Sequence, residues 1–185
     1  MDKKSLRTEI RRRISLLDSS YIEESNSSIF EKLICLPEFI SAPRVFTYCS
    51  VSREVDTRKL INHCFEIGKS VALPTNLFEG NMSFALINKS PEHLPAGVLS
   101  IPEPLPDAEI VFPREHDLII VPALCYDLNC YRLGQGGGYY DRFLSKCNAY
   151  SVGLCRELLL LEEVPTDKFD LPTKCLITEK RIARP

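Results

Sequence analysis

The sequence predicts an α/β fold with a mostly parallel sheet, and three observations support this prediction. Apolar runs at 44–50 and 70–74 enclose a helical pattern at 57–67, and strand–helix–strand order is typical of a parallel unit. A third apolar run at 117–122 precedes a glycine-rich segment and a helical pattern at 139–146. Hydrophobic content of 44% and charged content of 26% are ordinary for a folded globular protein.

Length and charge narrow the classes of function. The 185 residues suffice for one domain, 1–185, with a substantial core. A net charge of −2 provides no general basic field for nucleic acid, and no apolar run is long enough to span a membrane. The charged N-terminus lacks the apolar segment of a signal peptide. We therefore expect a cytoplasmic monomer without nucleic-acid or membrane partners.

The eight cysteines are expected to be reduced and mostly buried, because disulfides need a secretory context. No Cys-x-x-Cys pair occurs, and Cys125 and Cys130 have no partner pair at a spacing suited to zinc. The three histidines likewise share no metal-binding spacing. These side chains are therefore interpreted as structural or solvated.

The first segment has the pattern of an amphipathic helix. Lys3 points along its apolar stripe, Arg7 lies at the edge, and Arg12 points the opposite way. Cations beside a buried stripe are better placed to reach a ligand than cations on the free face. A basic helix with no ligand explains the pattern equally well. The stripe consists of Leu6, Ile10, Ile14 and Leu17.

Capping signals place the next two helices. Ser20 and Glu23 have capping-box spacing, and the helix that they begin ends before Pro37. Asp56 can cap the helix that follows the first strand, and Gly68 suits its end.

The sequence patterns of the other segments after residue 80 give weaker predictions of secondary structure. Residues 81–87 alternate as an antiparallel strand does, and the six prolines between 91 and 113 predict a fixed irregular loop. Strands are expected at 149–154 and 175–178, with a short helix at 157–162 between them. Residues 181–185 form a basic tail.

The glycine-rich segment Arg132–Arg142 is the most informative part of the sequence. A glycine cluster after a strand and before a helix exposes backbone N–H groups that gather an anion. Neither the Walker A pattern nor the dinucleotide fingerprint is present. Two flanking arginines suit phosphate, and Asp141 beside them suits Mg²⁺. A mobile surface turn with a helix cap is the alternative, and the arginines and the acid favour a phosphate site over it.

This segment resembles the signature of the 5-formyltetrahydrofolate cyclo-ligase family, also called methenyltetrahydrofolate synthetase. The resemblance extends over nearly the whole chain, at Lys3-Lys4-Ser5-Leu6-Arg7, the Glu54 segment, Ile101-Pro102-Glu103-Pro104, and Asp170 with Thr178-Glu179. It implies a three-layer αβα sandwich with a mostly parallel sheet, of the NagB/RpiA/CoA-transferase-like type. It also implies a ligase of one-carbon metabolism, which uses ATP and Mg²⁺ to convert 5-formyltetrahydrofolate into 5,10-methenyltetrahydrofolate, ADP and phosphate.

The resemblance also assigns roles to residues. Arg132 and Tyr139 would be catalytic, and Asp141 and Asp170 would position Mg²⁺. The folate would contact Cys49, through its backbone, and Glu54, Gln135, Gly136, Gly137, Gly138 and Tyr139. Glu54 also lies just beyond the carboxyl end of a strand, where open α/β sheets bind ligands, although such an acid is most often a plain surface residue. ATP would contact Lys3, Lys4, Ser5, Leu6, Arg7, Arg132, Leu133, Gly134, Gln135, Gly136, Gly137, Gly138, Tyr139 and Tyr140.

Two positions depart from the family pattern, and two other functions remain open. Cys130 stands where the family usually has glycine, and Phe169 stands where a histidine commonly precedes the second metal aspartate. A phosphate enzyme unrelated to folate, such as a sugar-phosphate isomerase, would need no ATP. A non-catalytic nucleotide-binding module would bind ATP and form no product.

Overall fold

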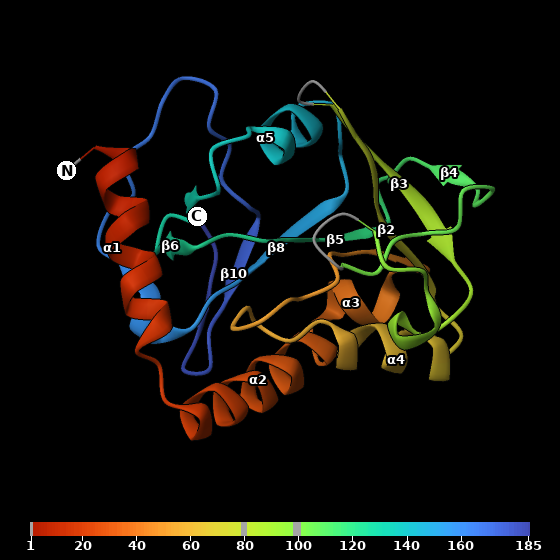
Figure 1. The fold of residues 1–185 in the computed structure, drawn as a ribbon, viewed down its shortest axis with the longest axis horizontal. Helices are drawn as coiled ribbons and strands as arrows, with labels where there is room; N and C mark the ends of the chain where they lie inside the picture. Colours follow the sequence, from red (N-terminus) through yellow and green to blue (C-terminus); the bar gives the residue numbers. More distant parts are fainter. Residues whose placement is uncertain (1, 79–80, 98–100) are drawn as a thin grey trace.

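The computed structural model describes residues 2–78, 81–97 and 101–185, and its centre is an eight-stranded sheet. The strand order is β11-β10-β8-β5-β1-β2-β3-β4 (Figure 1). The five strands from β10 to β2 run parallel, whereas β3, β4 and β11 are antiparallel to their neighbours. In chain order the strands are β1 (Arg44–Phe46), β2 (Ser70–Phe78), β3 (Asn81–Ile87), β4 (Ile110–Val111), β5 (Leu118–Val121), β8 (Tyr150–Leu154), β10 (Cys175–Ile177) and β11 (Ile182–Ala183).

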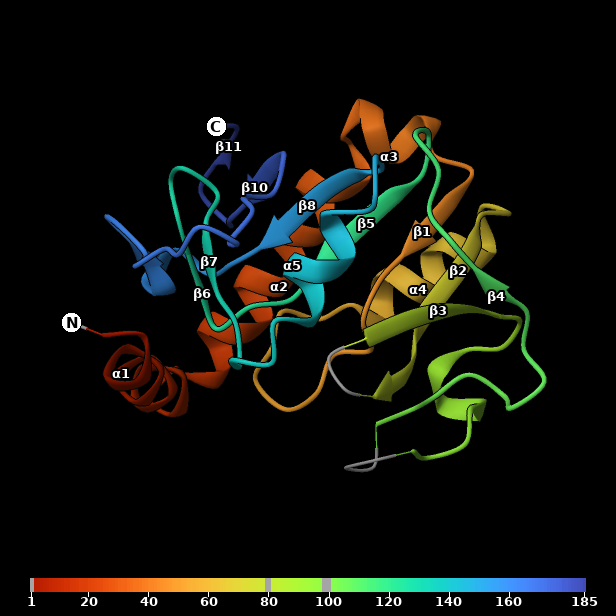
Figure 2. The same cartoon turned by 90° about the horizontal axis from the view of Figure 1, so that it is seen from above.

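Helices cover both faces of this sheet, which confirms the predicted three-layer αβα class. On one face lie α2 (Ser19–Ile34), α3 (Pro37–Ser41) and α4 (Arg58–Glu66), and on the other lies α5 (Tyr139–Leu144) (Figures 1 and 2). The side chains of β5 alternate accordingly. Leu118 and Ile120 belong to the core under the first helical layer, and Ile119 and Val121 pack with Phe143 of α5. The α5 layer is thin, because this helix has only six residues.

A second core holds α1 (Lys3–Ser15) against a small sheet. That sheet has the order β7-β6-β9, with β6 at Cys125–Asp127, β7 at Arg132–Leu133 and β9 at Leu160–Leu161. Leu6 and Ile10 of α1 are buried in this core, as the apolar stripe predicts. Figure 1 shows α1 standing beside β6 at one end of the molecule.

The small sheet is attached to the main sheet through Tyr126. Its hydroxyl donates a hydrogen bond to the Val121 carbonyl at 2.7 Å. Its ring lies so close to Gly153 of β8 that a Cβ atom there would be 2.5 Å from the ring. Gly153 is therefore required by the close approach of the tyrosine, and Tyr126 fixes the hairpin that carries Arg132.

Several local predictions were wrong in detail. The first cap of α2 is Asp18, which accepts from Ser20 N, so the Ser20–Glu23 capping box does not begin this helix. The first strand ends at Phe46 rather than at 50, and 157–162 forms a 3₁₀ turn, η3 (Glu157–Leu159), followed by β9. The basic tail contains β11. Most importantly, the four glycines at 134–138 follow β7 of the small sheet, and not directly the 117–122 strand.

Other predictions are confirmed. Gly68 has a φ of 76° just after the end of α4, as predicted. Asp56 accepts a hydrogen bond from Arg58 N at 2.8 Å, but the N-cap residue of α4 is Thr57 rather than Asp56. The 81–87 strand is antiparallel to β2. In its described part the proline-rich region contains the 3₁₀ turn η1 (Pro91–His93), the two-residue β4 and an isolated antiparallel bridge between Ala96 and Pro102.

The eight cysteines are all free thiols, and six of them are buried, with Cys147 partly covered and Cys35 exposed. Among the described residues no cluster of three or more histidine, cysteine or acidic side chains could hold a metal ion. None of the described helices is both long and apolar enough to cross a bilayer.

Candidate active site

A cavity of about 740 Å³ lies beyond the carboxyl ends of the central parallel strands. Glu54 reaches it from the turn after β1, and Pro122 and Ala123 line it directly after β5. Most residues that the sequence singled out meet here. The predicted site residues that line the cavity are Lys3, Arg7, Glu54, Arg132, Leu133, Gly134, Gln135, Gly136, Gly137, Gly138, Tyr139, Tyr140, Asp141 and Asp170.

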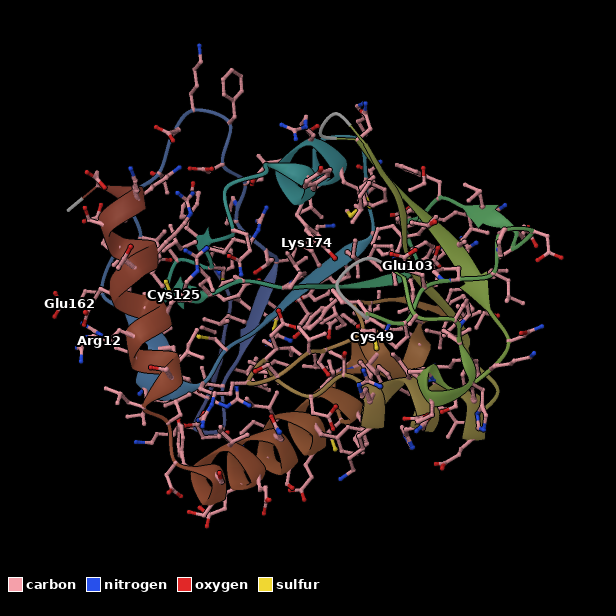
Figure 3. All side chains as sticks on the ribbon, viewed as in Figure 1. Arg12, Cys49, Glu103, Cys125, Glu162 and Lys174 are labelled. Atoms are coloured by element: carbon pink, nitrogen blue, oxygen red, sulfur yellow. The ribbon has the colours of Figure 1, made fainter. Side chains whose placement is uncertain are left out.

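Four predicted site residues do not line this cavity. Lys4 and Ser5 are exposed on α1, whereas Leu6 is buried in the core behind it. The helical period explains the exposure of Lys4 and Ser5, because positions 3 and 7 share one face and positions 4 and 5 turn away from it, whereas Leu6 turns into the core. Cys49 is buried in the core under the first helical layer, and Figure 3 shows it inside the molecule.

The glycine loop adopts a backbone that only glycine accepts without strain at two positions. Gly136 has a φ of 104°, and Gly138, the residue before α5, has a φ of 66°. The Arg7 guanidinium lies against Gly136, since a Cβ atom there would be 3.3 Å from Arg7 Cζ. Arg7 Nε also donates to the Gly134 carbonyl at 2.8 Å. Because α5 is short, we expect the loop amides and Arg7, rather than the helix dipole, to hold an anion here.

Two further side chains of α1 reach across to the other end of the chain. Arg11 Nη2 donates to Gln135 Oε1 at 2.6 Å. Lys3 Nζ donates to Asp167 Oδ2 at 2.6 Å and to Asp170 Oδ2 at 2.5 Å. Burial disfavours the charges of both Lys3 and Asp170, but hydrogen bonds outweigh it. The bonds to Asp167 and Asp170 raise the pKa of Lys3, and the bonds from Lys3 and from the Asp167 amide lower the pKa of Asp170. Arg12, in contrast, points outward and pairs with Glu9, as expected (Figure 3).

Arg132 is buried, and its guanidinium holds other parts of the site. Nη1 donates to the Leu171 carbonyl and Nη2 donates to Asp141 Oδ1, both at 2.6 Å. Asp141 Oδ1 also accepts from Leu171 N at 3.3 Å. The sequence predicted a forked phosphate ligand at this position. In the structure Arg132 lines the cavity, orients Asp141 and connects the glycine segment to the 167–171 segment.

The donor set fits Mg²⁺. Asp141 and Asp170 both line the cavity and present carboxylate oxygens, the ligands that this ion prefers. Among the described residues no group of three such side chains is arranged to hold a metal ion, and this is no obstacle, because Mg²⁺ commonly binds one or two carboxylates, keeps several waters and takes phosphate oxygens as further ligands.

Glu54 belongs to a tight turn after β1. Its amide donates to the Val51 carbonyl at 3.1 Å, and its Oε2 accepts from Val51 N at 3.0 Å. Burial raises the pKa of this carboxyl group, and the Val51 hydrogen bond offsets part of that shift. Glu54 lines both the main cavity and a smaller polar pocket on its other side.

Two tyrosines complete the wall at the start of α5. The Tyr139 ring covers Gly137, where a Cβ atom would be 2.7 Å from the ring. The Tyr140 hydroxyl is buried with no hydrogen-bond partner among the described residues, and burial raises its pKa. A buried hydroxyl without a partner is costly, so this atom favours a polar ligand in the cavity.

Sequence reasoning missed several residues of the site. Asp167 shares Lys3 with Asp170, and its spacing of three from Asp170 was the available signal. Arg11 lies one helical turn after Arg7 and was hidden among neighbouring charges. Apolar lining residues such as Met82 and Leu77 gave no signal, because their pattern is that of an ordinary strand. Phe169 also lines the cavity, although it is 73% exposed.

Comparisons with known proteins agree with this geometry. A sequence model of the 5-formyltetrahydrofolate cyclo-ligase family matches residues 1–179. The 5-formyltetrahydrofolate cyclo-ligase of Escherichia coli K12 is 31% identical over 180 residues, covering 94% of this chain and 98% of that protein. A probable 5-formyltetrahydrofolate cyclo-ligase of Schizosaccharomyces pombe is 30% identical over 200 residues, covering 100% of this chain and 98% of the relative.

Solved structures are similar as well. The 5,10-methenyltetrahydrofolate synthetase of Aquifex aeolicus has a TM-score of 0.84 and 33% identity, covering 100% of this chain and 93% of that one. A 5,10-methenyltetrahydrofolate synthetase of Mycoplasma pneumoniae has a TM-score of 0.78 at 18% identity, covering 97% of this chain and 99% of that one, which supports the fold. With a family match over almost its full length and relatives above 30% identity, this chain belongs to the 5-formyltetrahydrofolate cyclo-ligase family.

Proposed function

We propose that this protein is a 5-formyltetrahydrofolate cyclo-ligase, which uses ATP and Mg²⁺ to form 5,10-methenyltetrahydrofolate, ADP and phosphate. One observation carries the proposal. A single cavity brings together the glycine loop, cations from α1, two aspartates suited to a metal ion, and Glu54. These groups come from positions between 3 and 170, and a nucleotide and a second substrate must meet in this way to react.

The reaction sets a defined chemical problem. The oxygen of an N-formyl group is a poor leaving group, and transfer of the γ-phosphoryl group to it turns it into part of a phosphate ester. N10 then attacks the activated formyl carbon, the ring closes, and phosphate leaves. Phosphoryl transfer mainly requires positioning and neutralisation of charge, and not a covalent side chain. The cavity fits this requirement, since glycine backbone, cations and carboxylates line it, and no Ser–His or Cys–His pair is found among its described lining residues.

On the nucleotide side we assign the triphosphate to the amides of the glycine loop together with Lys3 and Arg7. Charge-assisted hydrogen bonds are worth about 1.5–3 kcal/mol each, so two cations add substantially to the loop amides. Asp141 and Asp170 would hold Mg²⁺, which when bound neutralises charge on the phosphate oxygens. Arg132 keeps Asp141 in place through the bond at 2.6 Å.

On the folate side we assign Glu54 and Tyr139. A carboxylate at the cavity wall can accept hydrogen bonds from the N–H groups of the pterin ring. The Tyr139 ring can stack on that ring, because aromatic faces attract one another. The cavity volume of about 740 Å³ is within the range of small-molecule sites.

The test is an optical assay for 5,10-methenyltetrahydrofolate with purified protein, 5-formyltetrahydrofolate and Mg²⁺, with and without ATP. We expect product only when ATP is present, in a 1:1 ratio with ADP. Product without ATP, or ATP binding without any product, would contradict the proposal. ATP binding without product would indicate that the protein is a non-catalytic nucleotide-binding module.

The proposal also treats residues 1–185 as one catalytic domain that acts as a cytoplasmic monomer, without nucleic-acid or membrane partners. Size-exclusion chromatography with light scattering checks the monomer, and cell fractionation checks the compartment. A dimer at assay concentrations would contradict the monomer assignment and would leave the proposed reaction unaffected.

A further inference from the structure

Arg156, which follows β8, is a charged residue that the proposed mechanism does not use. Its side chain is almost completely buried, with 1% of the residue exposed. It donates from Nε to Ser25 Oγ at 3.0 Å and from Nη1 to the Arg53 carbonyl at 2.9 Å. Nη2 donates twice, to Asn26 Oδ1 at 2.7 Å and to the Glu54 carbonyl at 3.0 Å. A single guanidinium therefore joins α2 to the turn that carries Glu54.

Burying the Arg156 charge costs more free energy than a purely structural role would require. All four acceptors are neutral oxygens, so no hydrogen-bonded carboxylate offsets the charge. Burial lowers the pKa of Arg156, which reports the same cost. Removing a cation from water without a paired anion costs several kcal/mol, and apolar residues of similar volume fill such positions at least as well. A role beyond stability therefore has to be considered.

The contacts show what the arginine fixes. It holds two successive carbonyl groups of the turn, those of Arg53 and Glu54. Asn26 Oδ1, which it also holds, accepts in addition from Asp56 N at 3.1 Å. The turn is thus fixed on both sides of the Glu54 side chain. Arg156 does not line the cavity, so its influence on a ligand must pass through Glu54.

We propose that Arg156 is a positioning residue for the folate substrate, acting by fixing the backbone of Glu54. The inference rests on the proposed function. It distinguishes the two substrates, because all four of these hydrogen bonds go to α2 or to the Glu54 turn, and not to the glycine loop, α1 or the 167–171 segment, to which we assign the nucleotide.

The main experiment measures the Michaelis constants of both substrates in Arg156→Met, with folding checked by circular dichroism. Since small misplacements of a binding group cost large factors, we expect the KM for 5-formyltetrahydrofolate to rise about tenfold or more, with kcat much less affected. The KM for ATP should stay within about twofold of the wild-type value. Equal changes in the two Michaelis constants, or no change in either, would overturn the inference.

Arg44→Met is the matched control. Arg44 is also a largely buried arginine, and it pairs with Asp117 at 2.5 Å near the amino ends of β1 and β5, away from the cavity. Its loss should lower the melting temperature and leave both Michaelis constants unchanged. If Arg44→Met raised the folate KM as much as Arg156→Met does, general destabilisation would explain both results and the positioning role would fail.

Two further variants separate positioning from folding. Arg156→Lys keeps a cation but offers fewer donors, so it should show an intermediate folate KM even if Arg156→Met fails to fold. In Arg156→Ala, added guanidinium ion should lower the folate KM toward the wild-type value, and methylammonium should do so less. A folded Arg156→Lys with the wild-type folate KM, or an absence of rescue by guanidinium, would contradict the proposal.

Failure of the inference can be told apart from failure of the proposed function. Equilibrium binding of 5-formyltetrahydrofolate to wild type and Arg156→Met tests the inference without turnover. Wild-type turnover with unchanged folate binding in the variant overturns only the role of Arg156. An absence of wild-type turnover and of folate binding overturns both.

Discussion

The two walls of the cavity are held in opposite ways. The Glu54 turn is fixed from behind by Arg156, a buried group that does not face the cavity. The other wall, formed by the glycine loop, α1 and the 167–171 segment, is the one that we assign to the nucleotide. It is held by charged side chains that themselves line the cavity, such as the pairs of Lys3 with Asp167 and Asp170. The Lys3 side chain is 24% exposed and that of Asp167 is 72% exposed, so water and ions reach these contacts.

The difference indicates how each wall responds to a ligand. A turn held by buried hydrogen bonds keeps its geometry whether or not a ligand is present. Charged pairs at the cavity surface can exchange partners, because phosphate and Mg²⁺ offer Lys3 and Asp170 alternatives of the same sign as their present ones. The wall that we assign to folate is thus preorganised, and the wall that we assign to the nucleotide is assembled in part from ion pairs.

Removing the charge of Asp141 should have the largest effect on turnover. In Asp141→Asn the fold should persist, because asparagine keeps an oxygen for Arg132 and Leu171 N. Turnover at saturating ATP and Mg²⁺ should fall by two orders of magnitude or more, about 3 kcal/mol in the barrier. Steady-state rates over a Mg²⁺ titration measure this effect. Activity equal to that of wild type would remove Asp141 from the metal site.

Gly136→Ala tests whether the loop backbone matters as much as its charges. The φ of 104° disfavours a side chain, and the new Cβ would meet the Arg7 guanidinium. With a left-handed residue costing about 1–2 kcal/mol, we expect ATP affinity to fall by roughly tenfold. Gly134→Ala is the control, since a Cβ there meets nothing within 4 Å. Calorimetric titration with a non-hydrolysable ATP analogue measures both, and equal affinities would exclude a backbone role for Gly136.

Lys3→Met tests how much the Lys3–Asp170 pair stabilises the fold, through the pH dependence of the free energy of unfolding. The lowered pKa of Asp170 means that the pair stabilises the fold above about pH 3.8 and is lost as pH falls through the folded-state value below it. The raised pKa of Lys3 means that the stabilisation is complete below pH 10.5 and is lost as pH rises further.

At pH 7 the variant should therefore be about 0.5–1 kcal/mol less stable than wild type, the range of partly exposed pairs. The difference should shrink as the pH is lowered below 3.8, the ordinary pKa of an aspartate. Urea unfolding at several pH values measures it, and the exposed neighbour Lys4, changed to Met, serves as control. A difference that is constant with pH would show that the pair does not stabilise the fold.

The smallest effect is expected in the hairpin that carries Arg132. Cys130 is buried and has a φ of 64°, in the left-handed region that favours glycine. Cys130→Gly removes the strain and the thiol, whereas Cys130→Ala removes only the thiol. We expect the glycine variant to be the more stable of the two by about 0.5–1 kcal/mol, the reverse of the usual order. Thermal unfolding measures the order, and a more stable alanine variant would show that the turn is not strained.

Much of the fold was predictable because local patterns and burial agree. The helical stripe of α1, the strand at 81–87 and the stop at Gly68 all follow from residues that are neighbours in sequence. The glycine segment was predictable as a site because its positive φ values require that composition. The departure at Cys130 is also understandable, since the backbone there has the conformation that glycine adopts without strain.

The rest of the site depends on long-range contacts that no pattern displays. The two-residue strand β7 is too short for a signal, so the glycine segment was placed after the wrong strand. The bond of Arg132 to the Leu171 carbonyl could not be predicted, because the two residues lie 39 positions apart. Arg156 was not noticed, since a single arginine after a strand resembles a solvated residue until its burial is known.

The docking of α1 has a consequence for how the protein folds during its synthesis. Its hydrogen bonds join residues separated by 127 positions, for Arg7 and Gly134, and by 164 positions, for Lys3 and Asp167. Such contacts close only after nearly the whole chain has left the ribosome, and long loops are slow to close. We therefore expect α1 to dock late in folding. A protease that cuts near residue 17 should therefore report nucleotide binding, because a ligand held by both partners keeps α1 docked.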